Sequence, residues 1–160
     1  MISECLYLPD LLGGVTLEAT ARGLRAIRFG EAPAVAAPGL LVYAAERQLR
    51  EYLAGERFVF DIPLDLAGTS FQMEVWKALT QISYGGTSSY RDIAVAVNRP
   101  RGFQAIGQAN TRNPIPVIVP CHRVINADGS MGGYGGGLGR KRQLLELEKR
   151  YAQRFRETAA

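Results

Sequence analysis

The sequence is poor in the residues on which metal centres and disulfide frameworks depend. Its 160 residues include two cysteines, Cys5 and Cys121, and one histidine, His122. Two thiols so far apart in the chain neither build a disulfide framework nor complete a four-ligand zinc site. We therefore expect no bound metal, and any imidazole chemistry must use His122.

Long apolar runs and a basic leader are also missing. The apolar stretches around Leu11, between Ala34 and Tyr43, and from Ile115 to Val119 are broken by Gly, Pro or charge. None approaches the roughly 18 residues that cross a membrane. No basic segment leads into an apolar one after Met1, so no signal peptide is evident. We expect no membrane partner and a cytoplasmic location.

The composition is that of a globular protein with an uneven distribution of charge. Hydrophobic residues make up 47% and charged residues 21% of the chain, which suits one domain or two small lobes with a core. Residues 1–66 carry six basic and nine acidic side chains, whereas residues 67–160 carry thirteen and six. The basic second part favours a polyanionic partner, although a solvated charged helix produces the same excess.

Residues 1–66 are predicted to form a small α/β lobe. Alternating apolar residues between positions 6 and 29 indicate the strands of a short hairpin sheet. Apolar spacing predicts one helix over 41–54, and alternation predicts a further strand over 58–64. No candidate catalytic residue is evident in this lobe.

Residues 67–160 are predicted to form a mostly helical lobe, so the fold class is α+β. A capping residue at Thr69 or Ser70 begins a predicted helix that ends at the glycine pair 85–86. A last helix is predicted over 140–154.

A winged-helix-like helix-turn-helix is predicted between those two helices. Ser89 followed by Asp92 is a capping pattern for a helix over 90–97, and a tight turn leads to a second helix over 101–112. Helical hairpins without a DNA function share this pattern. Core-facing positions on the second helix are Phe103, Ile106 and Asn110. Outward positions, small or polar with basic ends, are Arg101, Gln104, Ala105, Gln108, Ala109 and Arg112.

Cys121 is the candidate nucleophile. It follows a proline-rich apolar run that ends at Val119, and His122 and Arg123 come directly after it. The thiolate is the attacking form, so a reactive cysteine needs a group that takes or offsets its proton, and both neighbours can do so. A buried structural cysteine beside a hydrogen-bonded histidine fits the same residues.

Glu148 is predicted to be buried in the last helix. It lies three or four residues from Leu144, Leu145 and Tyr151, in the middle of the apolar face. A buried carboxylate without a partner strongly destabilises a fold, so Glu148 needs one. Two partners are open: His122, which would complete a Cys-His-Glu relay, or an arginine at the edge of the face.

Together these residues resemble those of a known family, the O6-alkylguanine-DNA alkyltransferases, or methylated-DNA-protein-cysteine methyltransferases. The resemblance is dense over residues 69–149 and loose before them. The matching motifs are Phe71-Gln72, Val75-Trp76, Ser89-Tyr90, Asn113-Pro114, Pro120-Cys121-His122-Arg123-Val124 and the glycine-rich stretch 132–138.

The resemblance implies DNA repair without a cofactor, by a monomer that acts once. The alkyl group of O6-alkylguanine in double-stranded DNA would move irreversibly to Cys121 after the base is flipped out. The sequence leaves open whether O4-alkylthymine is also a substrate. The resemblance implies catalytic roles for Cys121, His122, Glu148, Tyr90 and Asn113. Substrate contacts fall to Val124, Met131, Tyr134, Gly135 and Gly136. DNA contacts fall to Tyr90, Arg123 and the outward residues of the second helix.

The sequence departs from the family at two positions. Gln104 stands where the family usually has an arginine that fills the gap left by the flipped base, and Gly135 stands where relatives often have serine. Glutamine is shorter than arginine and uncharged, so it should stack less well and attract phosphates less strongly. The efficiency of base flipping is therefore in question. Two other functions stay open: a protein that recognises alkylated DNA without repairing it, and a cysteine hydrolase that uses Cys121.

Overall fold

The computed structural model of the protein describes residues 1–159, which divide into two compact units between Ala67 and Gly68. Each unit has its own buried apolar residues. Within residues 1–159, no helix has both the length and the apolar character to cross a membrane.

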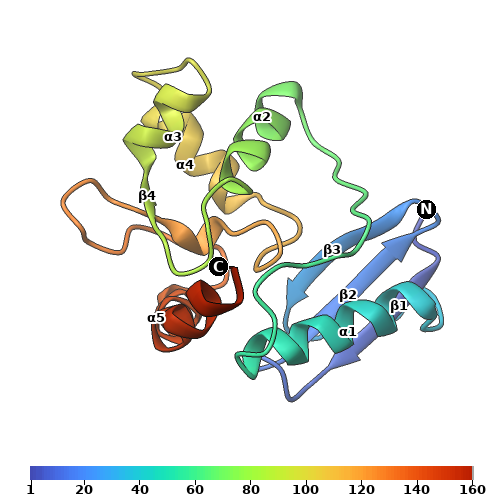
Figure 1. Cartoon of the computed structure of the whole chain (residues 1–160). Coiled ribbons are helices and arrows are strands. Elements are labelled where there is room, and N and C mark those ends of the chain that lie inside the picture. The colour runs from blue at the N-terminus through green and yellow to red at the C-terminus, as the bar shows by residue number, and fades with distance from the viewer. Residues whose placement is uncertain (160) are drawn as a thin grey trace. The chain divides into compact units, whose positions relative to one another are not determined.

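The amino-terminal unit is a three-stranded antiparallel sheet with one helix against it (Figure 1). The strands follow the order β1 (Glu4–Leu8), β2 (Val15–Thr20) and β3 (Gly23–Phe29). Helix α1 (Leu40–Leu53) lies along one face and contacts all three strands. Every residue of the central strand β2 is buried. The predicted hairpin sheet and helix are confirmed.

The strand predicted over 58–64 is wrong. In this segment only Leu64 makes a β-bridge, an isolated one to Leu24. The side chain of Gln48 takes the place of a neighbouring strand. Its Nε2 donates to the carbonyl of Asp61 at 3.1 Å, and its Oε1 accepts the N–H of Asp61 at 2.9 Å. Apolar alternation alone does not distinguish such a segment from a strand, because both are extended.

The carboxyl-terminal unit is mostly helical. Its helices are α2 (Ser70–Leu79), α3 (Tyr90–Ala96), α4 (Phe103–Thr111) and α5 (Leu138–Ala159). Its other elements are the parallel strands β4 (Ser88–Ser89) and β5 (Val124–Ile125) and the 3-10 turn η1 (Cys121–Arg123). Helices α2, α3 and α4 pack against one another (Figure 1).

Caps at Thr69 and Ser89 begin α2 and α3, as the sequence predicts, and in both helices the cap is a full capping box. Thr69 and Gln72 exchange side-chain and backbone hydrogen bonds at the start of α2, and Ser89 and Asp92 do so for α3. These bonds satisfy N–H groups that have no partner within the helix. The starting points of the two helices are therefore encoded locally.

Helix α2 is shorter than predicted. It ends at Leu79, and the chain continues in tight turns, in which the N–H groups of Gln81 and Ile82 bond to carbonyls three residues earlier. Such bonds close a helix by tightening its last turn. Gly85, with a φ of 77°, then reverses the chain direction toward β4, so the glycine marks a turn beyond the helix end.

Candidate active site

Cys121 begins the turn η1 and is only 3% exposed. Asn113 holds the loop before it, because its Nδ2 donates to the carbonyl of Val119 at 2.7 Å and its Oδ1 accepts the N–H of Ile115 at 3.0 Å. Val117, between those two contacts, has a φ of 75°, which a β-branched residue rarely adopts. One asparagine at the end of α4 thus spans a strained loop that carries the candidate nucleophile.

The Cys121 thiol is protonated at neutral pH. Burial raises its pKa to about 11, although hydrogen bonds from the side chains of Asn113 and Tyr134 and the positive charge of Lys141 act against that shift. Because the thiolate is the attacking species, transfer chemistry at this sulfur needs a base.

A histidine, an arginine and a glutamate are buried together next to Cys121. Nε2 of His122 lies 2.8 Å from Oε2 of Glu148. Nε and Nη2 of Arg123 donate to the two carboxylate oxygens, each at 2.9 Å. The two partners that the sequence leaves open are therefore both present, and they share one carboxylate.

His122 is a neutral base in this arrangement. Burial lowers its pKa, and Arg123 and Lys141 lower it further, against the opposing effect of Glu148. Burial would raise the pKa of Glu148, but hydrogen bonds from His122 and Arg123 lower it to about 2. An ionised carboxylate accepts Nε2–H, which leaves the lone pair on Nδ1. Nδ1 is buried and makes no hydrogen bond to any atom of residues 1–159.

Arg123, a predicted DNA contact, has its guanidinium engaged inside the unit. Besides the pair with Glu148, Nη1 donates to the carbonyl of Ile82 at 2.7 Å, and the group lies 5.8 Å from the ring centre of Tyr84. Arg123 is 7% exposed. A cation so placed helps to keep Glu148 ionised.

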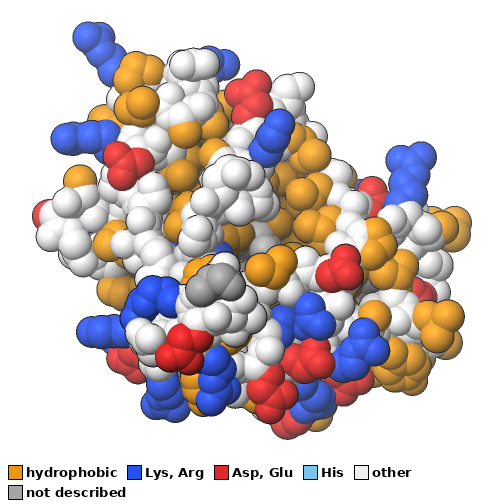
Figure 2. All heavy atoms as spheres, viewed as in Figure 1, with side chains coloured by type: hydrophobic (Ala, Val, Ile, Leu, Met, Phe, Trp, Pro, Cys, Tyr) orange, Lys and Arg blue, Asp and Glu red, His pale blue; other side chains and the backbone are white. Residues whose placement is uncertain are grey.

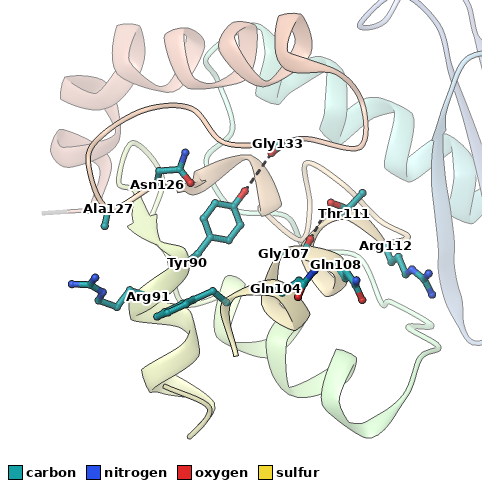
Figure 3. Close-up of a pocket in the computed structure, with 11 residues that line it drawn as sticks. Tyr90, Arg91, Gln104, Gly107, Gln108, Thr111, Arg112, Asn126, Ala127 and Gly133 are labelled. Atoms are coloured by element: carbon teal, nitrogen blue, oxygen red, sulfur yellow. Dashed lines mark hydrogen bonds between the residues drawn. The ribbon is translucent and has the colours of Figure 1, made fainter. Parts of the chain in front are cut away.

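A pocket of about 740 Å³ lies beside α3 and α4 (Figure 3). Tyr90, the first residue of α3, stands in it with its hydroxyl donating to the carbonyl of Gly133 at 3.4 Å. Among its other lining residues are Gln104, Gln108, Arg112, Asn126 and Ala127. Cys121 does not line the pocket, but Tyr90 is close enough for the cysteine to raise its pKa, after the larger effect of burial. Tyr90 thus belongs to the pocket wall and lies near Cys121.

The predicted faces of the second helix need two corrections. Gln104, Gln108 and Arg112 line the pocket, and Arg101 and Ala105 are exposed, as the outward assignment requires. Ala109, predicted to face outward, is 3% exposed, because the side of α4 that carries it packs on α2. Phe103, predicted to face the core, is 45% exposed and lines the pocket, since it is the first residue of the helix.

Lys141, a fully buried lysine on α5, is not among the residues that the sequence predicted for the site. Its Nζ donates to the carbonyls of Val124 at 2.6 Å, Gly133 at 3.0 Å and Met131. Burial lowers its pKa to about 8. The spacing along the helix could have identified Lys141 in the sequence. Position 141 is two helical turns before Glu148 and therefore shares its buried face. Lys141 ties β5 to the loop that borders the pocket.

Glycines let that loop pass close to its neighbours. A Cβ atom on Gly135 would lie 3.0 Å from the carbonyl oxygen of Thr111 on α4. A Cβ on Gly132, which has a φ of 69°, would lie 3.0 Å from the ring of Tyr90. The carbonyl of Gly136 accepts a hydrogen bond from Nη1 of Arg140 at 3.0 Å. The glycines therefore permit close backbone approach to α4 and Tyr90. The pocket lining includes none of the predicted substrate contacts, which are Val124, Met131, Tyr134, Gly135 and Gly136.

Other basic side chains of this unit lie at the surface. Figure 2 shows Lys and Arg side chains over α5 and over the end formed by α3 and α4. Within residues 1–159, no group of three or more His, Cys, Asp or Glu side chains is arranged to hold a metal ion. The unit thus combines a positive exterior with a buried thiol and base.

Comparison with known proteins links these features to one family. The family model "6-O-methylguanine DNA methyltransferase, DNA binding domain" matches residues 70–150. The methylated-DNA-protein-cysteine methyltransferase of Mycobacterium bovis is 56% identical over 112 residues, which are 70% of this chain and 67% of that protein. The crystal structure of Mycobacterium tuberculosis O6-methylguanine methyltransferase has a TM-score of 0.85 and 44% identity, over 94% of both chains. Another structure, of Mycobacterium tuberculosis OGT in complex with DNA, has a TM-score of 0.83 and 46% identity, over 92% of both chains.

Proposed function

Because the chain belongs to the 6-O-methylguanine DNA methyltransferase family, we propose that it repairs O6-alkylguanine in double-stranded DNA by irreversible transfer of the alkyl group to Cys121. One observation carries the assignment of the acceptor. Cys121 is buried, and His122 follows it directly in the chain. The imidazole of His122 is neutral, and Glu148 holds its Nε2, which leaves Nδ1 to act as the base. A protonated thiol beside an oriented base is what a nucleophilic displacement at carbon requires.

The reaction exchanges one bond and relocates one proton. Nδ1 of His122 takes the thiol proton of Cys121 through one bridging water, and the ionised Glu148 stabilises the imidazolium that forms. The sulfur attacks the alkyl carbon, a C–S bond forms, and the C–O6 bond breaks with its electron pair on guanine. The proton ends on guanine, so no co-reactant is needed. The thioether is stable in water, and each protein molecule reacts once.

Substrate enters through the pocket beside α4. Gln104, Gln108 and Arg112 present polar groups to the DNA, with Arg101 and Ala105 nearby on the exposed side. The flipped base displaces the Tyr90 hydroxyl from the Gly133 carbonyl, and that hydroxyl then donates to N3 of guanine. Flipping a base costs a few kcal/mol, least for a poorly paired one, which favours damaged guanine.

The base is read by backbone groups around the sulfur. The carbonyl of Val124 accepts one hydrogen bond from Lys141 and keeps a lone pair for the guanine amino group. Tyr134, Met131 and the glycines at 135–136 form the wall around the alkyl group.

We also infer that the protein acts as a monomer in the cytoplasm. Tyr90, Cys121, His122 and Glu148 all belong to one unit of one chain, so the reaction needs no residue from a second copy. Size-exclusion chromatography with light scattering should give the mass of a single chain, with and without DNA.

Transfer is tested with a duplex that contains one O6-methylguanine. After incubation, mass spectrometry should find one added methyl group on the peptide that contains Cys121 and none on the peptide that contains Cys5, whose thiol is buried in the other unit. Cys121→Ser should bind the duplex and leave the methyl group on the DNA. An unmodified Cys121 in a protein that still binds the methylated duplex would instead indicate recognition without repair.

Gln104→Arg is expected to tighten binding to the methylated duplex roughly fivefold and to speed repair. An arginine at this exposed pocket position adds a charge for the phosphates and a planar group that stacks where the base has left, together worth about 1 kcal/mol. Fluorescence anisotropy and single-turnover assays measure the two effects. Gln153→Arg adds the same charge at an exposed position on α5 and is the control. Equal gains from both variants would mean that net charge alone is responsible.

A further inference from the structure

Asn110 joins the DNA-facing helix to the nucleophile. It lies on the buried side of α4, is 3% exposed and does not line the pocket. Its Nδ2 donates to the carbonyl oxygen of Cys121 at 3.2 Å. The same oxygen accepts the backbone N–H of Val124 where the turn η1 ends. Two hydrogen bonds therefore hold this carbonyl, one from the turn and one from α4.

The other end of the Asn110 amide is unsatisfied. Its Oδ1 is buried and has no hydrogen-bond partner among residues 1–159. A buried acceptor without a partner destabilises a fold, and an apolar side chain of the same size would not. The neighbouring buried positions on α4, Ile106 and Ala109, carry such apolar side chains. The amide at 110 is thus a poor choice for stability alone.

The part of α4 that carries Asn110 is itself held in place by α2. The indole N–H of Trp76 on α2 donates to the carbonyl of Ala109 at 2.9 Å, one residue before Asn110. The peptide that links Cys121 and His122 is planar, so holding its oxygen also restricts the positions of the Cα atoms of both residues, which lie in the same plane. Asn110 can therefore set nucleophile and base together against α4.

We propose that Asn110 is a positioning residue for alkyl transfer: through the carbonyl of Cys121 it holds the peptide between the nucleophile and its base in a fixed orientation to the DNA-facing helix. The inference rests on the proposed function, because it assigns a role in that reaction. Asn110 touches neither the reacting carbon nor the DNA, and it acts only through the Cys121 peptide. Its contribution belongs to the rate of transfer from bound DNA and leaves DNA affinity unchanged.

Asn110→Leu tests this, because leucine has a similar size and offers no donor. Single-turnover transfer at saturating methylated duplex should slow about tenfold, the effect of one lost hydrogen bond in the reacting geometry. Affinity for the duplex, measured by anisotropy, should stay within about twofold. The urea midpoint, followed by the fluorescence of Trp76, should stay the same or rise, because the unpaired oxygen is removed. A merely structural asparagine would give a lower midpoint and an unchanged rate, and that result overturns the proposal.

Two further variants keep the test decisive. Asn110→Ala removes the same bond without adding volume, so it replaces the leucine variant if that chain does not fold, and it too should transfer slowly. Ile106→Val is the matched control, because Ile106 is fully buried on the same helix. It should lower the urea midpoint and leave the transfer rate unchanged. A wild-type chain that transfers nothing overturns the proposed function and this inference together. If the wild type is active and both Asn110 variants transfer the methyl group at the wild-type rate, the inference alone is overturned.

Discussion

Glu148→Gln should slow methyl transfer about 100-fold while duplex affinity changes little. The amide can still accept a hydrogen bond from His122, but it no longer stabilises the imidazolium that forms when the ring takes the Cys121 proton. The buried Arg123 also loses its counter-charge. Leaving one charge of a buried pair unbalanced should lower the free energy of unfolding by about 3 kcal/mol. Single-turnover assays and urea unfolding followed by Trp76 fluorescence measure the two effects.

The control for this variant is Glu146→Gln, an exposed glutamate on the same helix. It removes the same charge at the surface, where the effect on unfolding and on transfer should be small. Transfer at the wild-type rate in Glu148→Gln would contradict the relay through His122.

The stability difference between wild type and Glu148→Gln should depend on pH. The pKa of Glu148 is lowered from 4.5 to about 2 in the folded protein. A carboxyl group with a lowered pKa stabilises the fold above its unfolded pKa and loses that effect as the pH falls toward the folded one. The difference should therefore be constant above about pH 5 and shrink between about pH 4.5 and pH 2. Urea midpoints of both proteins across this range check the prediction, and a constant difference would mean that the carboxylate is not the stabilising form.

Lys141→Met is the second substitution with a large expected effect. Methionine fills much of the space of the lysine stem but leaves the carbonyls of Val124, Met131 and Gly133 without their shared donor. Losing charged hydrogen bonds at a buried site should lower the free energy of unfolding by about 3 kcal/mol. Transfer should slow as well, because the Gly133 carbonyl also accepts the Tyr90 hydroxyl and the loop that carries it would be released.

Urea unfolding and single-turnover transfer measure the two effects of Lys141→Met. Lys149→Met is the matched control, since Lys149 is exposed on the same helix, and it should change neither quantity appreciably. An Lys141→Met protein with wild-type stability would show that water or a rearranged loop satisfies the three carbonyls.

Short-range patterns predicted several elements and the position of the nucleophile. The capping residues Thr69 and Ser89 mark helix starts, because a cap is completed within three residues. The burial of Glu148 followed from its place among leucines on α5, because a helix fixes which side chains share a face. The order of residues around Cys121 indicated a candidate nucleophile, and the resemblance to the alkyltransferases implied that its sulfur accepts the alkyl group.

Predictions that depended on packing were less accurate. Gln48 reaches across from α1 to bind a segment predicted to be a strand. Phe103 is exposed because α4 begins there, and Ala109 is buried because its side of α4 packs on α2. These outcomes depend on neighbours that are distant in sequence, and periodicity within one segment contains no information about them.

The chain's local order was sufficient to indicate an α+β protein with a candidate nucleophilic cysteine, a neighbouring base and a buried acid, because helix period, capping and the Cys-His-Arg string are local properties. How the charges pair emerged only in three dimensions. One carboxylate serves both His122 and Arg123, Lys141 holds three carbonyls, and Asn110 bonds to the nucleophile's own peptide. A buried polar group takes its partner from whatever the fold brings within about 3 Å, and that distance is set by the packing of whole helices.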